Sequence, residues 1–124
     1  MRQRPNQRLG TAGEDLAAAY LRERGYRIVA RNWRPHGAQL RGEVDIVAVR
    51  ADVLCFVEVK TRRGERFGGP LEAVTWRKQA RVRALATAYL QHAGAGRWVV
   101  RFDVIGVVTR AGQAPAVVHV PAAF

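Results

Sequence analysis

Cysteine is almost absent from this 124-residue sequence, in which Cys55 is the only one. A single cysteine excludes an intrachain disulfide and a cysteine-based zinc site. There is also no run of about 18 uncharged apolar residues, so no transmembrane helix is expected. The first residues are basic but lack the apolar core of a signal peptide, which makes the cytoplasm the expected compartment.

Acidic residues are scarce as well. Asp and Glu total 10 against 21 Lys and Arg, which gives a formal net charge of +11. A small basic domain favours polyanionic partners. Arginine dominates, and because it grips phosphate with two parallel hydrogen bonds, we expect nucleic acid rather than a membrane as the partner. A GC-rich genome would explain the ratio of Arg to Lys, but not the excess of basic over acidic residues.

The hydrophobic pattern predicts a flexible basic arm over residues 1–10 and a single domain over residues 11–124, which is long enough to bury a core. Thr11-Ala12-Gly13-Glu14 matches a capping box, with Thr11 as the N-cap of the first helix. Pro70 suits the first turn of a second, longer helix. The expected elements follow the order α-β-β-β-α-β-β around a mixed sheet, with helices at 11–24 and 70–92 and strands at 26–33, 43–50, 53–60, 97–109 and 116–120.

Charged residues interrupt two of the apolar strands, which is unusual. Asp45 lies in one strand, and Glu58 and Lys60 share a face of the next because side chains alternate along a strand. Only Ala51-Asp52 separates the strands, so they should form a hairpin. With that turn Asp45 lies opposite Glu58. A four-residue loop would keep this register and a three-residue loop would break it.

Two facing carboxylates repel each other, and a divalent cation between them removes the repulsion. Oxygen ligands suit Mg²⁺, so we expect Asp45 and Glu58 as metal ligands, with the backbone carbonyl of Val59 as a further candidate. A metal held there would activate water and stabilise charge on a phosphodiester, with Lys60 assisting. The same register places Glu43 opposite Lys60. The alternative is a surface hairpin with a Glu43–Lys60 ion pair and solvated acids, but the pattern D…E-x-K favours a site.

Four segments in chain order carry a family resemblance: Gly13-Glu14, Gly42–Val47, Val57–Arg62 and Arg101–Val104. From about Gly10 to Val108 the chain resembles the YraN-type uncharacterised bacterial family, which is itself similar to archaeal Holliday-junction resolvases and other restriction-endonuclease-like nucleases of the PD-(D/E)xK type. Val44 stands where the motif's name has proline.

That resemblance implies a restriction-endonuclease-like, three-layer α/β/α fold and a Mg²⁺- or Mn²⁺-dependent endonuclease. It places Asp45 and Glu58 as metal ligands, Lys60 as the catalytic lysine and Glu14 as the helix-borne acid of the site. By analogy with the resolvases, which cut two strands symmetrically as dimers, a homodimer is an alternative to a monomer.

The substrate surface is expected on the second helix and the loop before it, where basic residues crowd and could follow a phosphate backbone. Gln79 resembles the helix glutamine of some related nucleases and is, with Glu43, a secondary candidate. Trp33 and Trp76 could stack on bases, although packing in the core or at its rim is the favoured role for each. Asp103 is expected to be structural. The candidate nucleic-acid contacts are Arg62, Arg63, Arg77, Lys78 and Arg81.

The favoured function is therefore cleavage of DNA, including branched or damaged DNA, with recognition of shape rather than sequence. The first alternative is a non-catalytic module that binds DNA or RNA and retains the fold. A second is an RNA-directed or ribosome-associated basic protein. The sequence leaves the natural substrate, the metal preference and the pathway open.

Overall fold

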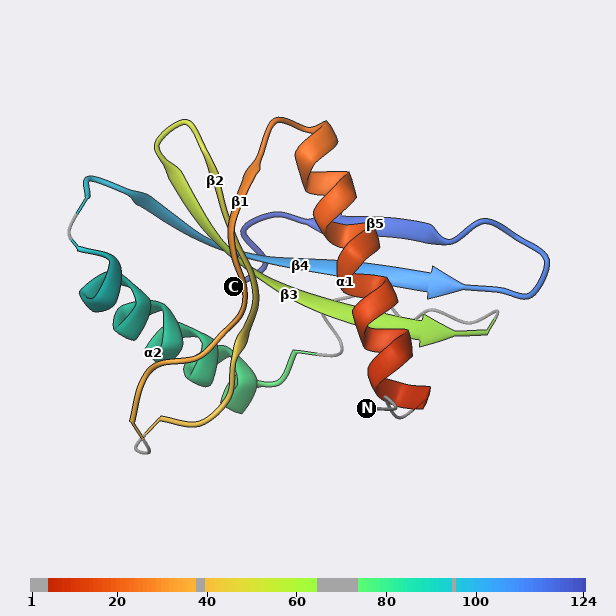
Figure 1. Cartoon of the computed structure of the whole chain (residues 1–124), viewed down its shortest axis with the longest axis horizontal. Coiled ribbons are helices and arrows are strands. Elements are labelled where there is room, and N and C mark those ends of the chain that lie inside the picture. The colour runs from red at the N-terminus through yellow and green to blue at the C-terminus, as the bar shows by residue number, and fades with distance from the viewer. Residues whose placement is uncertain (1–4, 38–39, 65–73, 95) are drawn as a thin grey trace.

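The structure is a computed structural model that describes residues 5–37, 40–64, 74–94 and 96–124, with side chains from residue 11 onward. Its elements follow the predicted order α-β-β-β-α-β-β (Figure 1). They are α1 (Pro5–Glu23), β1 (Arg27–Trp33), β2 (Val44–Arg50), β3 (Val53–Arg63), α2 (Trp76–Ala93), β4 (Val99–Thr109) and β5 (Ala116–Val120).

One five-stranded sheet holds the fold together, with the strands side by side in chain order. Neighbouring strands run antiparallel except β3 and β4, which are parallel. A parallel pair needs a long crossover, and the chain between β3 and β4 contains α2. The mixed sheet expected from the sequence is thereby confirmed.

The two helices cover opposite faces of the sheet. On β3, Cys55 and Val57 pack in the cluster that contains Ala17 and Leu21 of α1, whereas Phe56 packs in the cluster that contains Leu85 of α2. Successive strand residues point to opposite faces, so the arrangement has three layers, α/β/α, as predicted. In Figure 1, α1 crosses β3, β4 and β5 obliquely. Neither helix of the described chain is long and apolar enough to cross a membrane.

The β2–β3 hairpin has the predicted register. Arg50 pairs with Val53 across the turn, and the ladder continues without a shift to Ile46 and Val57. Ala51 in the turn has a positive φ of 53°. At the start of β2, Val44 packs with Val47 against α2, and not with Ile46 on the α1 face as alternation along the strand would require. Strict alternation therefore fails where β2 begins.

Both helices begin elsewhere than the sequence suggested. The first starts at Pro5, so Thr11 lies inside α1 and is not its N-cap. Proline fits a first turn because its missing N–H has no helical partner there. The second helix does not run from Pro70, which lies outside the described residues, but starts at Trp76. Its N-cap is Thr75, whose hydroxyl accepts a hydrogen bond from the Lys78 N–H at 3.1 Å.

A buried polar network joins β4 to the end of the chain. Asp103 is fully buried and accepts hydrogen bonds from Arg101 at 2.8 Å, and it lies 2.6 Å from His119 Nε2. Burial alone would raise the pKa of Asp103, but the bonds from His119, Arg101 and the Ala122 N–H outweigh it and hold the pKa well below its usual range. The structural role expected for Asp103 is what these contacts provide.

Gly13 lets α1 approach β3 closely. A Cβ at this position would lie 2.1 Å from Oγ1 of Thr61, which is closer than any real contact. Alanine normally favours a helix over glycine by about 1 kcal/mol. The glycine therefore reflects a packing constraint. The close approach that it allows sets the distance between the sheet and the next residue of α1, Glu14.

We predict that Gly13→Ala destabilises the protein despite the higher helix propensity of alanine, by about 1–3 kcal/mol, the usual cost of overpacking. Chemical denaturation measures this. Adding Thr61→Ala removes the obstructing hydroxyl and should recover most of the loss. Equal or greater stability of Gly13→Ala alone would show that the contact with Thr61 does not constrain the helix.

Candidate functional site

Asp45 is anchored across the hairpin where the backbone ladder of β2 and β3 stops. The last paired residues are Ile46 and Val57, and the same register places Asp45 opposite Glu58. Two residues after Val57, the N–H of Val59 donates a hydrogen bond to Oδ2 of Asp45 at 2.8 Å. The side chain of Asp45 thus accepts a hydrogen bond from a backbone N–H of β3, the strand that carries Glu58.

Glu58 is an acid buried in the sheet, with 4% of its surface exposed. Its Oε1 lies 2.9 Å from Nζ of Lys78 on α2 and 3.9 Å from Nζ of Lys60 on its own strand. Its Oε2 is buried, and among the described residues it has no hydrogen-bond partner. Because a buried carboxylate oxygen without a partner is costly, this atom marks a place where a cation would be stabilising.

The proton affinity of Asp45 reflects the same crowding of acids. Burial and the nearby charges of Glu58 and Glu14 raise its pKa from 3.8 to about 7, against the opposing effects of the Val59 N–H and Lys78. Near neutral pH the ionised form of Asp45 is therefore disfavoured unless a positive charge compensates it.

Glu14 reaches the same cluster from α1. Its two carboxylate oxygens lie 3.0 and 3.1 Å from Nδ2 of Asn32 on β1, and the same amide nitrogen lies 3.2 Å from Oε1 of Glu43. Arg31 is 3.6 Å from Glu14. The structure therefore brings Glu14, Asp45 and Glu58 into one region, with Asn32 connecting the first of them to the neighbouring acid Glu43.

Glu43, which the hairpin register placed opposite Lys60, lies beyond the last paired residues of β2 and β3. It precedes the first residue of β2 and pairs with Arg34, at 2.8 Å between Oε2 and the guanidinium. Regular pairing has ended by this point, so the extrapolated register no longer applies. The side-chain amide of Gln79, the other secondary candidate, donates a hydrogen bond to the Val74 carbonyl at 3.3 Å.

The basic residues expected to bind nucleic acid separate into two groups. Arg62 and Arg63 at the end of β3 and Arg77 and Arg81 on α2 are exposed. Lys78 instead points inward and contacts Glu58. The sequence placed Lys78 on the phosphate-binding surface, whereas in the structure its ammonium lies beside the acid Glu58.

Two site residues were not identified from the sequence, namely Asn32 and, in its role beside Glu58, Lys78. Asn32 has a positive φ of 50° inside a strand. Such backbone is strained and clusters at functional sites. The signal was the asparagine itself, because this residue is disfavoured in strands, but its partners on α1 and before β2 could not be read from spacing.

No three His, Cys, Asp or Glu side chains within the described ranges are grouped so as to hold a metal ion by themselves. Asp45 and Glu58 are accordingly a two-carboxylate site, and further ligands would have to come from the backbone, from water or from a substrate. The carboxylate oxygens of Asp45 and Glu58 are hard donors, which suit Mg²⁺ or Mn²⁺ and not a soft metal.

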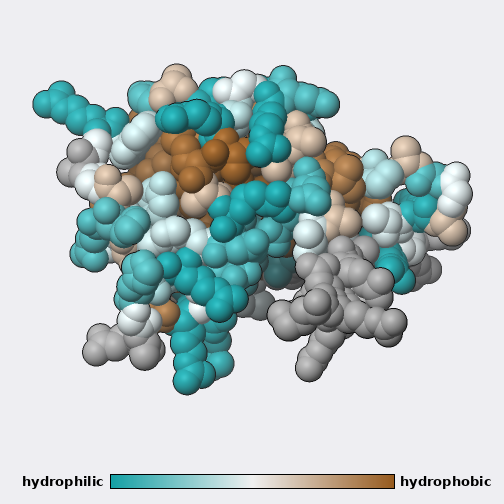
Figure 2. Space-filling view, viewed as in Figure 1, coloured by the Kyte–Doolittle hydropathy of each residue, from teal (hydrophilic) through white to brown (hydrophobic). Residues whose placement is uncertain are grey.

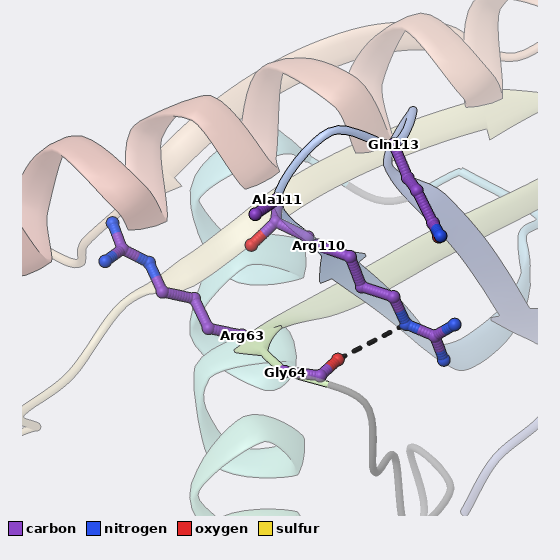
Figure 3. A pocket seen from close by; sticks show the side chains of 6 residues that line it. Arg63, Gly64, Arg110, Ala111 and Gln113 are labelled. Atoms are coloured by element: carbon purple, nitrogen blue, oxygen red, sulfur yellow. Dashed lines mark hydrogen bonds between the residues drawn. The ribbon is translucent and has the colours of Figure 1, made fainter.

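The cavity drawn in Figure 3 lies away from the acids. It has a volume of about 620 Å³ and is lined by residues at the end of β3 and β4, among them Arg63, Gly64, Arg110 and Gln113. Arg63 is about 16 Å beyond Glu58 at the usual rise of a strand. In Figure 3 the side chain of Arg63 points away from those of Arg110 and Gln113, so the polar groups do not converge on one ligand position.

Comparison with known proteins identifies relatives along most of the chain. Residues 13–107 match the family described as "Uncharacterised protein family UPF0102". The UPF0102 protein of Rhodococcus jostii is 50% identical over 119 residues, covering 96% of this chain and 98% of its own. That of Nocardia farcinica is 47% identical over 118 residues, covering 95% and 90%, and that of Geobacter sulfurreducens is 47% identical over 119 residues, covering 96% and 90%. The resemblance noted in the sequence is confirmed.

We predict that Asp45→Asn stabilises the metal-free protein at pH 8 by about 2 kcal/mol. A carboxyl whose folded pKa lies above its unfolded value stabilises the fold at low pH, and this contribution is lost as the pH rises from 3.8 to about 7. The advantage of the asparagine should therefore be small at pH 4 and grow toward pH 8. Denaturation in EDTA at several pH values measures it.

Asp52→Asn is the matched control, since Asp52 is exposed in the turn of the same hairpin and its substitution should change stability by less than about 0.5 kcal/mol. A benefit of Asp45→Asn that does not vary with pH would refute the argument from its pKa.

Proposed function

The chain belongs to the uncharacterised protein family UPF0102, and we propose that it is a metal-dependent endonuclease of the PD-(D/E)xK type that hydrolyses phosphodiester bonds in DNA. The observation that carries this proposal is the buried Oε2 of Glu58, which has no hydrogen-bond partner among the described residues and lies in register with Asp45 and beside Lys60. A cation between the two acids would satisfy this oxygen and could activate a phosphodiester for hydrolysis.

Mg²⁺ or Mn²⁺ would be held by Asp45, Glu58 and the backbone carbonyl of Val59. When bound, such an ion lowers the pKa of a coordinated water and stabilises the negative charge that grows on the phosphodiester. The donor set fits this choice, because Glu58 offers an oxygen that has no partner in the described part of the chain, and Asp45 offers Oδ1 while Oδ2 accepts the Val59 N–H. Glu14 would support the site from α1.

Two lysines next to Glu58 would have different roles in the proposed reaction. Lys60 and Lys78 approach the same oxygen of Glu58 from β3 and α2, at 3.9 and 2.9 Å. Lys60, the lysine of the motif, is the more distant one and is free to orient a water or to accept negative charge from the phosphate. Lys78 forms the closer ion pair with the buried carboxylate of Glu58.

DNA is the proposed substrate because a net charge of +11 attracts a polyanion. Arg77 and Arg81 on α2, and Arg62 and Arg63 at the end of β3, are exposed and free to contact phosphates on either side of the acids. A non-catalytic module that binds DNA or RNA is the second candidate, and it is favoured by the absence, among the described residues, of three His, Cys, Asp or Glu side chains grouped to hold a metal ion. A homodimer also remains a proposal.

The test is to incubate purified protein with labelled four-way-junction, flap, duplex and single-stranded DNA, and with RNA, in Mg²⁺, Mn²⁺ or EDTA. We expect cleavage that requires metal and is lost in Asp45→Asn and Lys60→Met, but kept in Asp52→Asn. Cleavage that survives Asp45→Asn would assign the activity to a contaminant or to another site. Salt-sensitive binding without cleavage under every condition would support the non-catalytic module.

Metal binding can be tested separately from activity. Mg²⁺ should raise the unfolding temperature of the wild-type protein at pH 8, because a ligand that binds only the folded state stabilises it. It should have little effect on Asp45→Asn, in which the repulsion is already relieved. Equal stabilisation of both proteins would place the ion elsewhere.

We further predict that Lys78 and Arg81 differ although both lie on α2. Lys78→Met should lower kcat by about ten- to a hundredfold with little change in DNA affinity, because its ammonium lies 2.9 Å from Oε1 of Glu58. Arg81→Ala should weaken DNA binding and reduce its salt dependence by about one phosphate contact. Single-turnover cleavage and binding titrations over a range of salt separate the two effects. A loss of affinity alone in Lys78→Met would return that lysine to the binding surface.

A further inference from the structure

Trp76 is a large apolar side chain left in water. It is the first residue of α2 and 81% of its surface is exposed. Tryptophan side chains are mostly buried in folded proteins. Trp33 follows this rule, because its ring packs edge-on against Tyr89, with 5.2 Å between ring centroids, beside the core cluster on the α2 face. The expectation that both tryptophans pack is therefore wrong for Trp76.

The indole stands at the rim of the acidic site. Lys78, two residues further along α2, contacts Glu58, and the helix rises only about 3 Å over two residues. Residues two apart point to different sides of a helix, so Lys78 faces the acids and Trp76 faces outward beside them. A strand advances about 3.4 Å per nucleotide in duplex DNA, which puts the indole within a few nucleotides of a phosphate at Glu58.

The surroundings of Trp76 are cationic rather than apolar. Arg77 and Arg81 are exposed on the same helix, while the other large exposed apolar residues belong to β1, β5, the start of β4 and the residue before it. Figure 2 shows apolar residues gathered in one band, surrounded by hydrophilic ones on the visible face. A protein partner would bury an apolar patch, whereas a lone indole among arginines matches a nucleotide, in which a flat neutral base is joined to a negatively charged phosphate.

We propose that Trp76 is a stacking platform for an unpaired base next to the phosphodiester held at Asp45 and Glu58. The inference rests on the proposed function and narrows its substrate to DNA with unpaired nucleotides beside the cut. In a continuous duplex both faces of each base are covered by its neighbours, so an external ring can stack only on a base that is unpaired or terminal.

The test uses single-stranded DNA and a duplex of the same sequence, each with 2-aminopurine, bound in EDTA so that no cleavage occurs. Wild-type protein should quench the fluorescence of the single strand. Trp76→Ala should weaken single-strand binding about tenfold and duplex binding by less than about twofold, since stacking on one base is worth about that much or more. Trp76→Phe should restore most of the affinity. Trp98→Ala, a half-exposed tryptophan just before β4, is the control and should bind like wild type.

The outcomes are separable. Equal losses on both DNAs, or no loss in Trp76→Ala, would overturn the proposal, as would a change of Trp76→Ala in oligomeric mass by light scattering, which would assign the indole to self-association. With Mg²⁺, Trp76→Ala should lose preference for flaps and single strands over duplex. If no DNA is cleaved but the single-strand binding still depends on Trp76, the nuclease proposal fails and the proposed stacking site is retained. If DNA is cleaved but Trp76→Ala binds single strands like wild type, only the stacking proposal fails.

Discussion

The hydrogen bond from the Val59 N–H to Asp45 holds two acidic strands together at the point where their own ladder ends. Without it the opposed carboxylates of Asp45 and Glu58 would be expected to splay the strands, because like charges directly opposite one another destabilise a sheet. The bond keeps Asp45 close to Glu58 while leaving Oε2 of Glu58 without a partner among the described groups. Lys78 and Glu14 both act on this pair, since Lys78 contacts Glu58 and the charges of both residues affect the pKa of Asp45.

The remainder of the fold supplies the rigidity that the pair requires. Phe56 and Val57, immediately before Glu58, are buried against opposite helices, so β3 cannot shift or rotate without opening both cores. On the α1 side, Gly13 sets the distance to Thr61, and Asn32 holds Glu14 through its strained backbone position. The unfavourable burial of Asp45 is tolerated because dispersion and hydrophobic contacts on both faces stabilise the same strands.

Sequence patterns predicted what depends on local periodicity and failed where distant segments meet. The short Ala51-Asp52 turn determines the hairpin register, and period-two alternation places Glu58 and Lys60 on one face, so the central acids followed from spacing. The start of α1 at Pro5, the Thr75 cap and the Arg34 partner of Glu43 did not. Each was a choice between chemically similar options, such as two capping sites or two cations, that only tertiary contacts decide.

The different distances of Lys60 and Lys78 from Glu58 bear most directly on the proposed catalytic role of the site. A purely structural ion pair would be satisfied by one cation, and Lys78 at 2.9 Å already neutralises Oε1 of Glu58. Lys60 at 3.9 Å adds little to that pairing, yet it is held on an interior strand with most of its side chain buried. A buried ammonium is costly unless something negative compensates it. The phosphate of a bound nucleic acid, with Glu58 turned to a metal ion, would provide that charge, whereas a module that only binds DNA would gain more from an exposed lysine.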